Sequence, residues 1–257
     1  MLTAIIRTPA SSLTDQCEVT FIERSAMSMA TLQAQHAAYQ RALEQAGARV
    51  IALKAISDLP DSVFVEDAAV VLDEVAVLTR PGSASRLPEP AHLEPVLAGH
   101  RTLQRIRAPG TLEGGDVLRV GQTLFVGHSV RTNTEGIAQL ERFVQIYGYK
   151  VITVMVGGSL HLKTACTFLN ANTLLHNPDW VDTTPFQGFE RISVASGEAF
   201  AANVLVVGSS LLVNAAYPKT LELIRQRDDS AVIPVDISEF GKAEAGLTCM
   251  SLMFNAV

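Results

Sequence analysis

Four pairs of short apolar runs recur along the chain, and each pair is split by two or three turn-forming residues. The turns lie near Asp73, Gly121, Ala171 and Gly208, about 48, 50 and 37 residues apart. Apolar runs of this length on both sides of a short polar break are typical of β-hairpins. The sequence therefore predicts a repeated hairpin, and a repeat of this period limits the chain to a small group of stacked or closed folds.

A helical stretch and a further strand follow most of the hairpins, as in residues 133–147 and 150–156. Units of this size cannot bury both faces alone, so they stack or close into a ring. The two chain ends supply one more unit, with a strand at 247–254 and another at 2–7 beside it. We therefore predict a five-bladed, pseudo-symmetric α/β propeller, built from hairpin-plus-helix repeats around a central funnel. No Pro-rich tract or charge block interrupts the chain, which predicts a single domain over residues 1–257.

Composition limits the class of function. A chain of 257 residues that is 48% hydrophobic can bury a large core. Its net charge of −6, without a basic run, argues against nucleic acid and against an anionic membrane as partner. We expect a small-molecule partner instead. The start has too few apolar residues before Arg7 for a signal-peptide core, so we expect a cytoplasmic location.

Polar residues whose side chains could act in catalysis or binding stand just before successive hairpins. Glu66 and Asp67 precede the first, Glu113 the second and His161 the third, and Cys249 lies in the closing unit. Equivalent positions of a ring of like units converge on its axis. We therefore expect acids, a histidine and a cysteine to meet in the central funnel, although they are far apart in the sequence.

Each of these residues also has a structural explanation. A free cysteine in an apolar run, such as Cys166 or Cys249, usually behaves as a small hydrophobe. Glu113 beside two glycines is typical of a turn. The three cysteines form no CxxC pair and the six histidines no HxH or HExxH pattern, so we expect no metal site.

Several strings carry a resemblance to a known family: LPDSVFVED (59–67), LTRPGSASR (78–86), APGTLEGGD (108–116), RTNTEG (131–136), LHLKT (160–164) and LTCMSL (247–252). They resemble those of the dimethylarginine dimethylaminohydrolases, part of the guanidino-group-modifying (pentein) superfamily with its five-bladed α/β propeller. The resemblance runs in order from Arg7 to the C-terminus. It implies a hydrolase of C–N bonds in linear amidines, which converts dimethylarginine or monomethylarginine to citrulline and a methylamine without a cofactor.

The chemistry of such a reaction matches the residue types present. A guanidinium carbon is a poor electrophile, and a thiol forms a covalent intermediate that divides the reaction into easier steps. Cys249 is implied as this nucleophile. An imidazole can protonate the leaving amine and then activate water, which is the role implied for His161. Carboxylates accept paired N–H donors of a guanidinium. Glu66 and Asp67 are candidates, with Asp67 implied as the main ligand and Glu113 as the partner that orients His161.

The far end of an arginine-like substrate carries a carboxylate and an ammonium group. Arg86 and Arg131 can fork onto a carboxylate in a way that lysine cannot. The resemblance implies this role for both, with help from Asp61 and from backbone groups near Ala243. It also implies that Phe64 forms an apolar wall beside the alkyl stem of the substrate.

The chain departs from the family pattern near the entrance of the expected site. The loop 13–17 matches a mobile lid, but Cys17 stands where the family has an apolar substrate-binding residue. Related reactions therefore stay open, either an arginine deiminase-like hydrolysis or an amidinotransferase in which an amine replaces water. A non-catalytic propeller that binds partners is a third possibility. Either a monomer or a homodimer is compatible with the sequence.

Overall fold

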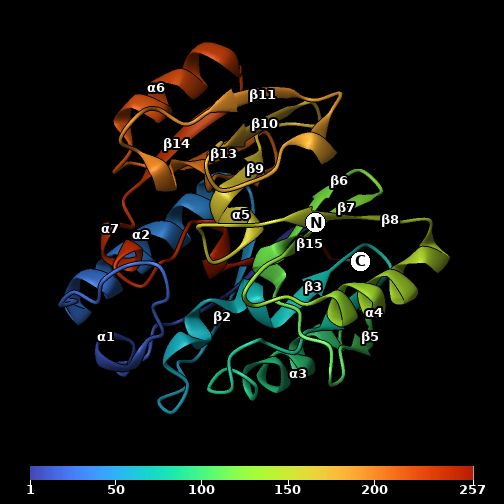
Figure 1. Ribbon diagram of the computed structural model, residues 1–257. Coiled ribbons are helices and arrows are strands. Elements are labelled where there is room, and N and C mark those ends of the chain that lie inside the picture. Colours follow the sequence, from blue (N-terminus) through green and yellow to red (C-terminus); the bar gives the residue numbers. More distant parts are fainter. Residues whose placement is uncertain (257) are drawn as a thin grey trace.

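The hairpin repeat becomes five three-stranded sheets in the computed structural model, which describes residues 1–256 (Figure 1). In each sheet an antiparallel pair is extended by a third strand that runs parallel to its middle strand. A parallel neighbour needs a crossover, and a helix or a 3₁₀ turn lies in each crossover. The predicted five-bladed α/β propeller is thereby confirmed.

We number the sheets as blades 1 to 5. Blade 1 has β3 (Ala69–Val71), β4 (Val75–Leu78) and β5 (Thr102–Arg105), and blade 2 has β6 (Val117–Val120), β7 (Thr123–His128) and β8 (Lys150–Met155). Blade 3 has β9 (Cys166–Phe168), β10 (Thr173–His176) and β11 (Glu190–Ser193). Blade 4 has β12 (Leu205–Val207), β13 (Ser210–Asn214) and β14 (Ala231–Val235). Blade 5 joins both ends of the chain, with β15 (Leu252–Asn255), β1 (Leu2–Arg7) and β2 (Arg49–Leu53).

A one-turn helix precedes the first strand of every blade. These turns are η2 (Val65–Ala68), η4 (Gly114–Asp116), α5 (Leu162–Ala165), η7 (Ala199–Ala202) and η8 (Thr248–Met250). The strand predicted at 247–254 is therefore wrong in its first half, because residues 248–250 form such a turn and β15 begins only at Leu252. The correction matters for function, since Cys249 lies on the turn and not within the sheet.

The crossover helices vary in length from blade to blade. They are α2 (Met29–Gln45), α3 (Glu94–Leu97), α4 (Thr134–Val144), η6 (Thr184–Phe186) and α6 (Pro218–Arg227). The remaining short helices are α1 (Leu13–Gln16), η1 (Pro60–Val63), η3 (Glu89–His92), η5 (Gln145–Tyr147) and α7 (Ser238–Gly241). The predicted helix at 133–147 is confirmed as α4 and η5, and Asn133 caps it by accepting from the backbone N–H of Gly136.

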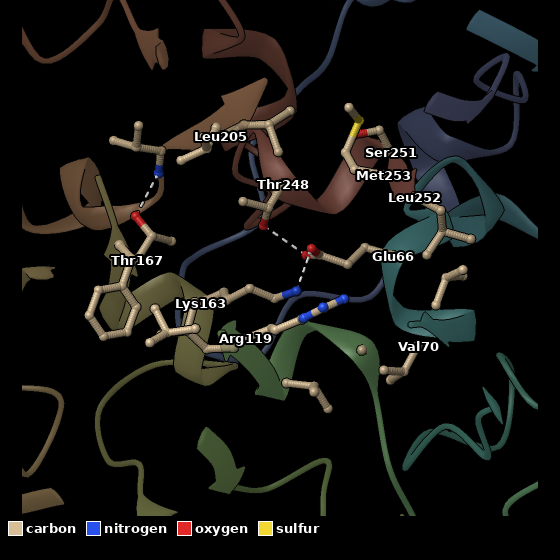
Figure 2. Close-up of a pocket in the computed structure, with 18 of the residues that line it drawn as sticks. Glu66, Val70, Arg119, Lys163, Thr167, Leu205, Thr248, Ser251, Leu252 and Met253 are labelled. Carbon is tan, nitrogen blue, oxygen red and sulfur yellow. Dashed lines mark hydrogen bonds and ion pairs between the residues drawn. The ribbon is translucent and has the colours of Figure 1, made fainter. Parts of the chain in front are cut away.

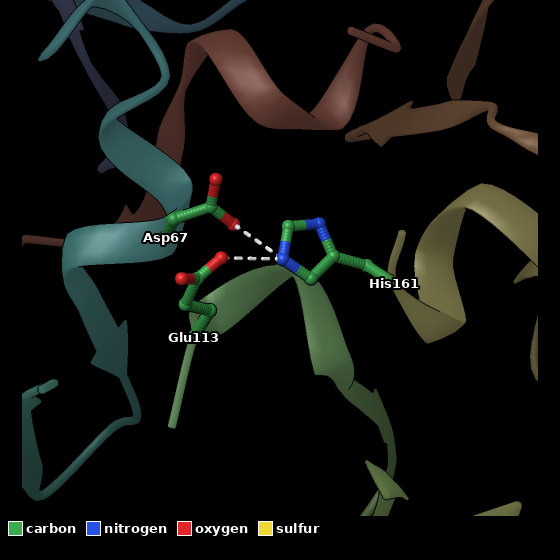
Figure 3. Close-up of side chains that lie close together, drawn as sticks. All are labelled: Asp67, Glu113 and His161. Atoms are coloured by element: carbon green, nitrogen blue, oxygen red, sulfur yellow. Dashed lines mark hydrogen bonds and ion pairs between the residues drawn. The ribbon is translucent and has the colours of Figure 1, made fainter. Parts of the chain in front are cut away.

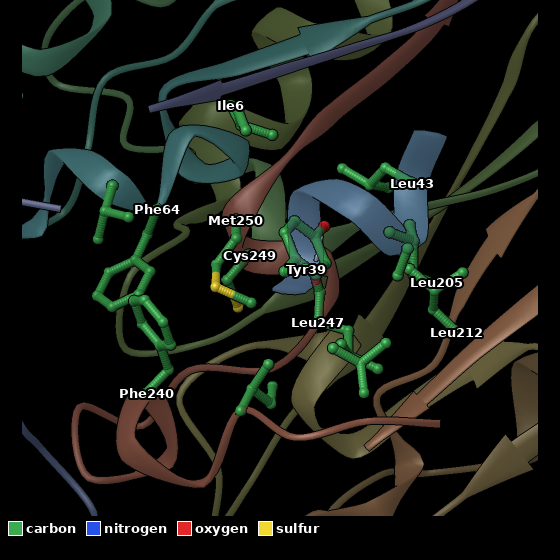
Figure 4. Packing of buried hydrophobic residues seen from close by; sticks show 14 of the residues in the cluster. Ile6, Tyr39, Leu43, Phe64, Leu205, Leu212, Phe240, Leu247, Cys249 and Met250 are labelled. Atoms are coloured by element: carbon green, nitrogen blue, oxygen red, sulfur yellow. Dashed lines mark hydrogen bonds between the residues drawn. The ribbon is translucent and has the colours of Figure 1, made fainter. Parts of the chain in front are cut away.

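Five apolar clusters form the core, each between neighbouring blades. The cluster of blades 4 and 5 also contains α2 and α7, and Cys249 belongs to it together with Phe64, Phe240 and Tyr39 (Figure 4). The Tyr39 hydroxyl, itself buried, donates to the carbonyl of Leu247 at 2.8 Å. The turn that carries Cys249 is thus held by apolar packing and by a buried hydrogen bond.

Among residues 1–256, no helix has both the length and the apolar character needed to span a membrane.

Candidate active site

Most of the predicted site residues line one small cavity of about 20 Å³, which includes residues of the turns that precede the blades. We call it the Cys249 cavity. Its lining comprises Glu18, Asp61, Phe64, Asp67, Arg86, Arg131, Leu160, His161, Ala243, Glu244, Ala245 and Cys249. Glu113 is not part of the lining but contacts His161 directly, whereas Glu66 and Cys17 lie elsewhere. Residues from four blades thus meet, as equivalent positions of a ring should.

Two carboxylates face the same nitrogen of the His161 ring (Figure 3). Its Nε2 lies 2.6 Å from a carboxylate oxygen of Glu113 and 3.8 Å from one of Asp67. Burial alone lowers the pKa of the imidazole, but the charge of Asp67 and the hydrogen bond to Glu113 outweigh it and raise the pKa to about 9. The ring is therefore an imidazolium at neutral pH. Because Nε2 is occupied by Glu113, Nδ1 is the ring nitrogen left to exchange a proton.

Both carboxylates are fixed by backbone donors. Glu113 accepts from the N–H of Gly82 at 2.9 Å, and Asp67 accepts from the N–H of Gly115 at 3.0 Å. A Cβ on Gly115 would come within 2.7 Å of both an Asp67 oxygen and Nδ1 of His161, so only glycine allows this close approach. Burial raises the pKa of both carboxyls, but their partners outweigh it. The charges of His161 and Arg86 lower the pKa of Asp67. The hydrogen bond to His161, together with the charge of its ring, lowers the pKa of Glu113.

Cys249 is a buried, neutral thiol. Its Sγ accepts a weak hydrogen bond from the N–H of Gly246 at 3.3 Å. Burial raises the pKa of this thiol to about 12, and the negative charges of Glu66 and Asp67 contribute to the increase. A thiol in this field stays protonated until a cation compensates the acids.

Glu66 faces a second and larger cavity, of about 440 Å³, which is lined by hairpin residues of the five blades (Figure 2). Its two oxygens accept from Lys163 at 2.5 Å and from the Thr248 hydroxyl at 2.7 Å. Asn203 braces the same group by bonding both the carbonyl of Lys163 and the backbone N–H of Thr248. The substrate-binding role expected for Glu66 stays a prediction, since its oxygens are engaged away from the Cys249 cavity.

Sequence reasoning did not identify Lys163 or Asn203. Lys163 stands in the string LHLKT two residues after His161, so a signal was present, but a single lysine is common on any surface. Asn203 had no sequence signal beyond its place before the fourth hairpin.

Arg86 is buried, and its guanidinium forms ion pairs with Asp67 and Glu89. It forks onto Glu89 through Nε at 3.0 Å and Nη2 at 2.8 Å, and its Nη1 lies 2.8 Å from Asp67. Its Nη2 also reaches the carbonyls of Asp61 and Phe64 at 3.4 and 3.3 Å. The carboxylate-binding role expected for Arg86 stays a prediction, because each of its nitrogens already has a partner.

Arg131 is buried but less fully engaged. Its Nη2 donates to the Thr20 hydroxyl at 3.3 Å, while its Nη1 has no hydrogen bond of good geometry and lies 3.0 Å from the Glu18 carboxylate. Asp61 accepts from the backbone N–H of Glu18 at 3.2 Å, and burial raises its pKa to about 6. The cavity thus offers one arginine donor and one carboxylate here, and Nη1 of Arg131 also lies 3.7 Å from the buried Glu113 carboxylate.

The apolar wall is formed by Phe64, whose ring meets that of Phe240 edge-on with centroids 6.5 Å apart. Ala243 lines the cavity as part of the loop after α7. Cys17, the last residue of the loop 13–17, belongs to the apolar cluster of blades 4 and 5, and Nη1 of Arg24 lies 3.6 Å from its thiol. Burial, assisted by the charge of Asp61, raises the pKa of Cys17, so this thiol is also neutral.

Asp67, Glu113 and His161 are also of the right type to bind a metal, because their donor atoms lie within 4.8 Å of one another. The charge around them is unfavourable to a second cation, however. The Arg86 guanidinium already lies 2.8 Å from Asp67 and 3.9 Å from Glu113. Arg86 therefore already compensates part of the negative charge that a metal ion would need, and its ion pair also competes with a substrate guanidinium for Asp67.

Two comparisons of sequence place the chain among known enzymes. The family model of arginine deiminase matches residues 54–204, more than half of the chain. The dimethylarginine dimethylaminohydrolase of Pseudomonas aeruginosa is 37% identical over 252 residues, which cover 97% of this chain and 98% of the relative. That of Streptomyces coelicolor is 39% identical over 250 residues, with coverage of 97% and 95%.

The fold comparison agrees. A solved structure of DDAH from Pseudomonas aeruginosa, a cysteine-to-serine mutant complexed with citrulline, superimposes with a TM-score of 0.93 at 37% identity, covering 98% of both chains. The propeller and its cysteine, histidine and acidic residues define a guanidine-modifying hydrolase, an enzyme that cuts C–N bonds of guanidino groups. Within this class the chain belongs to the dimethylarginine dimethylaminohydrolase family.

Proposed function

We propose that the chain, acting as one catalytic domain over residues 1–257, hydrolyses Nω-methylated arginines to citrulline and a methylamine, with Cys249 as nucleophile. The observation that carries this proposal is the convergence of Cys249, the His161–Glu113 pair and Asp67 at one buried cavity. The citrulline in the Pseudomonas structure supports the product. The cytoplasmic location expected from the sequence is part of the proposal.

The first half of the reaction forms a covalent intermediate. The bound guanidinium lowers the pKa of the thiol, which releases its proton to solvent; Sγ of Cys249 then attacks the guanidinium carbon, and a tetrahedral adduct forms. As the C–N bond to the methylated nitrogen breaks, the His161 imidazolium gives its proton to that nitrogen, and the neutral amine departs. The pKa of about 9 supports this role, because the ring carries a proton to give at neutral pH.

The second half regenerates the cysteine. His161, now neutral, takes a proton from water, and the oxygen attacks the carbon of the thiouronium intermediate. The C–S bond then breaks as the carbonyl of citrulline forms. The second proton of the water goes to the thiolate and restores the thiol, and the departed amine takes up a proton from solvent. Glu113, 2.6 Å from Nε2, stabilises the positive charge each time the ring is protonated.

Binding of the substrate also activates the nucleophile. A guanidinium beside Asp67 brings a positive charge to the acids that raise the pKa of Cys249. The pKa of the thiol falls when that charge arrives, so a cationic planar ligand assists its own attack. A neutral ligand of the same shape leaves Cys249 protonated.

The far end of the substrate is proposed to be bound by Arg131 and Asp61. The Nη1 of Arg131 is a buried donor without a well-aligned hydrogen bond, which supports a role in binding a carboxylate. Asp61 suits the ammonium group, and a cation there lowers its raised pKa. Phe64 lies beside the alkyl stem.

A panel of guanidines tests the proposal. The enzyme is incubated with dimethylarginine, monomethylarginine, arginine and a methylated alkylguanidine, and citrulline and free amine are measured separately. Turnover of the methylated arginines above arginine supports the proposal. Faster turnover of arginine, with ammonia released, points to a deiminase. Amine-dependent transfer without citrulline identifies an amidinotransferase.

A further inference from the structure

The segment 13–25, which begins with the loop matched to a lid and which we call the lid segment, places a charged group of its own at the Cys249 cavity. The carboxylate of Glu18 lies 3.0 Å from Nη1 of Arg131, and the hydroxyls of Ser83 and Ser85 also donate to it. Arg131 is the residue proposed to bind the carboxylate of the substrate. A carboxylate of the chain therefore lies on the donor that a substrate carboxylate needs.

The inner end of the cavity repeats this arrangement with the opposite charge. The Arg86 guanidinium lies on Asp67 at 2.8 Å, and Asp67 is the residue proposed to bind the guanidinium of the substrate. The free volume of about 20 Å³ has room for about one water molecule. An amino-acid guanidine can therefore enter only after some of the lining groups have moved.

We infer that Glu18 is a specificity-determining residue, whose carboxylate competes with the carboxylate of the substrate for Arg131. The inference rests on the proposed role of Arg131. An amino-acid substrate has to replace the Glu18–Arg131 ion pair with its own, whereas an alkylguanidine without a carboxylate makes no demand on Arg131. Glu18 therefore disfavours carboxylate-bearing substrates relative to carboxylate-free ones.

The exposure of the two side chains indicates which one moves. The side chain of Glu18 is 32% exposed, and that of Arg131 is 9% exposed. Glu18 can turn into water at the cost of this partly exposed ion pair and of its hydrogen bonds from Ser83 and Ser85, while Arg131 remains in the cavity wall. The competition is therefore modest, and its expected size is about two- to fivefold in binding.

Variants of two other acids distinguish this competition from a general loosening of the lid segment. Glu244 accepts from the backbone N–H groups of Thr20 and Phe21 at 2.5 and 2.6 Å, so it holds the lid without an ion pair to Arg131 among the described contacts. Glu23 is an exposed acid of the same segment, for which the described residues provide no ion pair. Glu244→Gln loosens the lid, and Glu23→Gln removes the same charge as Glu18→Gln.

The experiment measures kcat and KM of wild type and of Glu18→Gln, Glu244→Gln and Glu23→Gln with two substrates. These are dimethylarginine and an N,N-dimethyl-N′-alkylguanidine of the same length without the carboxylate and ammonium groups. Binding of L-arginine by calorimetry in the Cys249→Ser background gives the same comparison without turnover. In Glu18→Gln, KM for dimethylarginine and Kd for L-arginine should fall about two- to fivefold, while KM for the alkylguanidine stays the same.

Three results would overturn the inference. The first is that KM for dimethylarginine does not fall in Glu18→Gln. The second is that KM changes alike for both substrates, as it does in Glu244→Gln. The third is that Glu23→Gln lowers KM for dimethylarginine as much as Glu18→Gln does. If wild type turns over neither substrate, the proposed function fails, and the calorimetric comparison still decides the competition at Arg131.

Discussion

Alkylation of Cys249 by iodoacetamide, followed as a function of pH, measures how the thiol becomes a nucleophile. The pKa of about 12 stands three units above the ordinary value of 9.0, first because of burial and then because of Glu66 and Asp67. The thiolate fraction at neutral pH is therefore lower by a factor of about 10³, and alkylation should be slower by up to that factor than in a cysteine of ordinary pKa. A background without the other thiols, Cys17→Ser and Cys166→Ser, isolates the reaction.

A saturating unreactive amidine should accelerate this alkylation and shift its titration to lower pH, because the cation compensates the acids. Each unit of pKa recovered gives about tenfold more thiolate at neutral pH. Glu66→Gln should accelerate alkylation of the free enzyme without any amidine, since it removes one of the charges that raise the pKa of Cys249. If the free enzyme titrates below about 8.5 and the amidine changes nothing, a resting ion pair of Cys249 with His161 is the better account and the reasoning is refuted.

Four further outcomes are expected. Cys249→Ser should bind substrate without turnover, while Cys166→Ser remains active. Acid quench of His161→Gly with substrate should trap a covalent adduct on Cys249, detected by mass spectrometry. Normal turnover in Cys249→Ser or His161→Gly removes that residue from the mechanism. Arg131→Lys should raise KM for dimethylarginine but not for an alkylguanidine, whereas Arg86→Lys, which breaks the internal ion pairs, should impair both; the reverse pattern exchanges their roles. The pKa of His161 in the folded protein, about 9, exceeds its ordinary value of 6.5, so the stability that the imidazolium gives the fold is complete below about pH 6.5 and is lost as pH rises through 9. The Tm difference between wild type and His161→Gly should therefore shrink over this range. A constant difference contradicts the prediction.

The architecture could be predicted from the sequence because its signals are local. Each hairpin is encoded by neighbouring apolar runs and the turn between them, and its repetition implies closure into a ring. The ring in turn implies that residues at equivalent positions converge, and for this reason Asp67, His161 and Cys249 could be expected at one cavity before any coordinates. The turn at 248–250 was missed, because an apolar run of eight residues does not distinguish a strand from a short helix followed by a strand.

The partners of the charged side chains were decided only by the tertiary structure. Glu66 bonds Thr248, 182 residues away, and Glu244 holds Thr20, 224 residues away, so no local pattern announces either contact. Judged from the sequence, Arg86 could bind a substrate carboxylate or Glu89 in a forked arrangement. Which of the two it binds depends on the acids that the blades bring within reach. The sequence by itself determined which chemical groups are available and that a ring gathers them. Their pairing depends on distances of a few ångströms between blades, because charge interactions weaken with separation and exposure, and only the packed fold sets both.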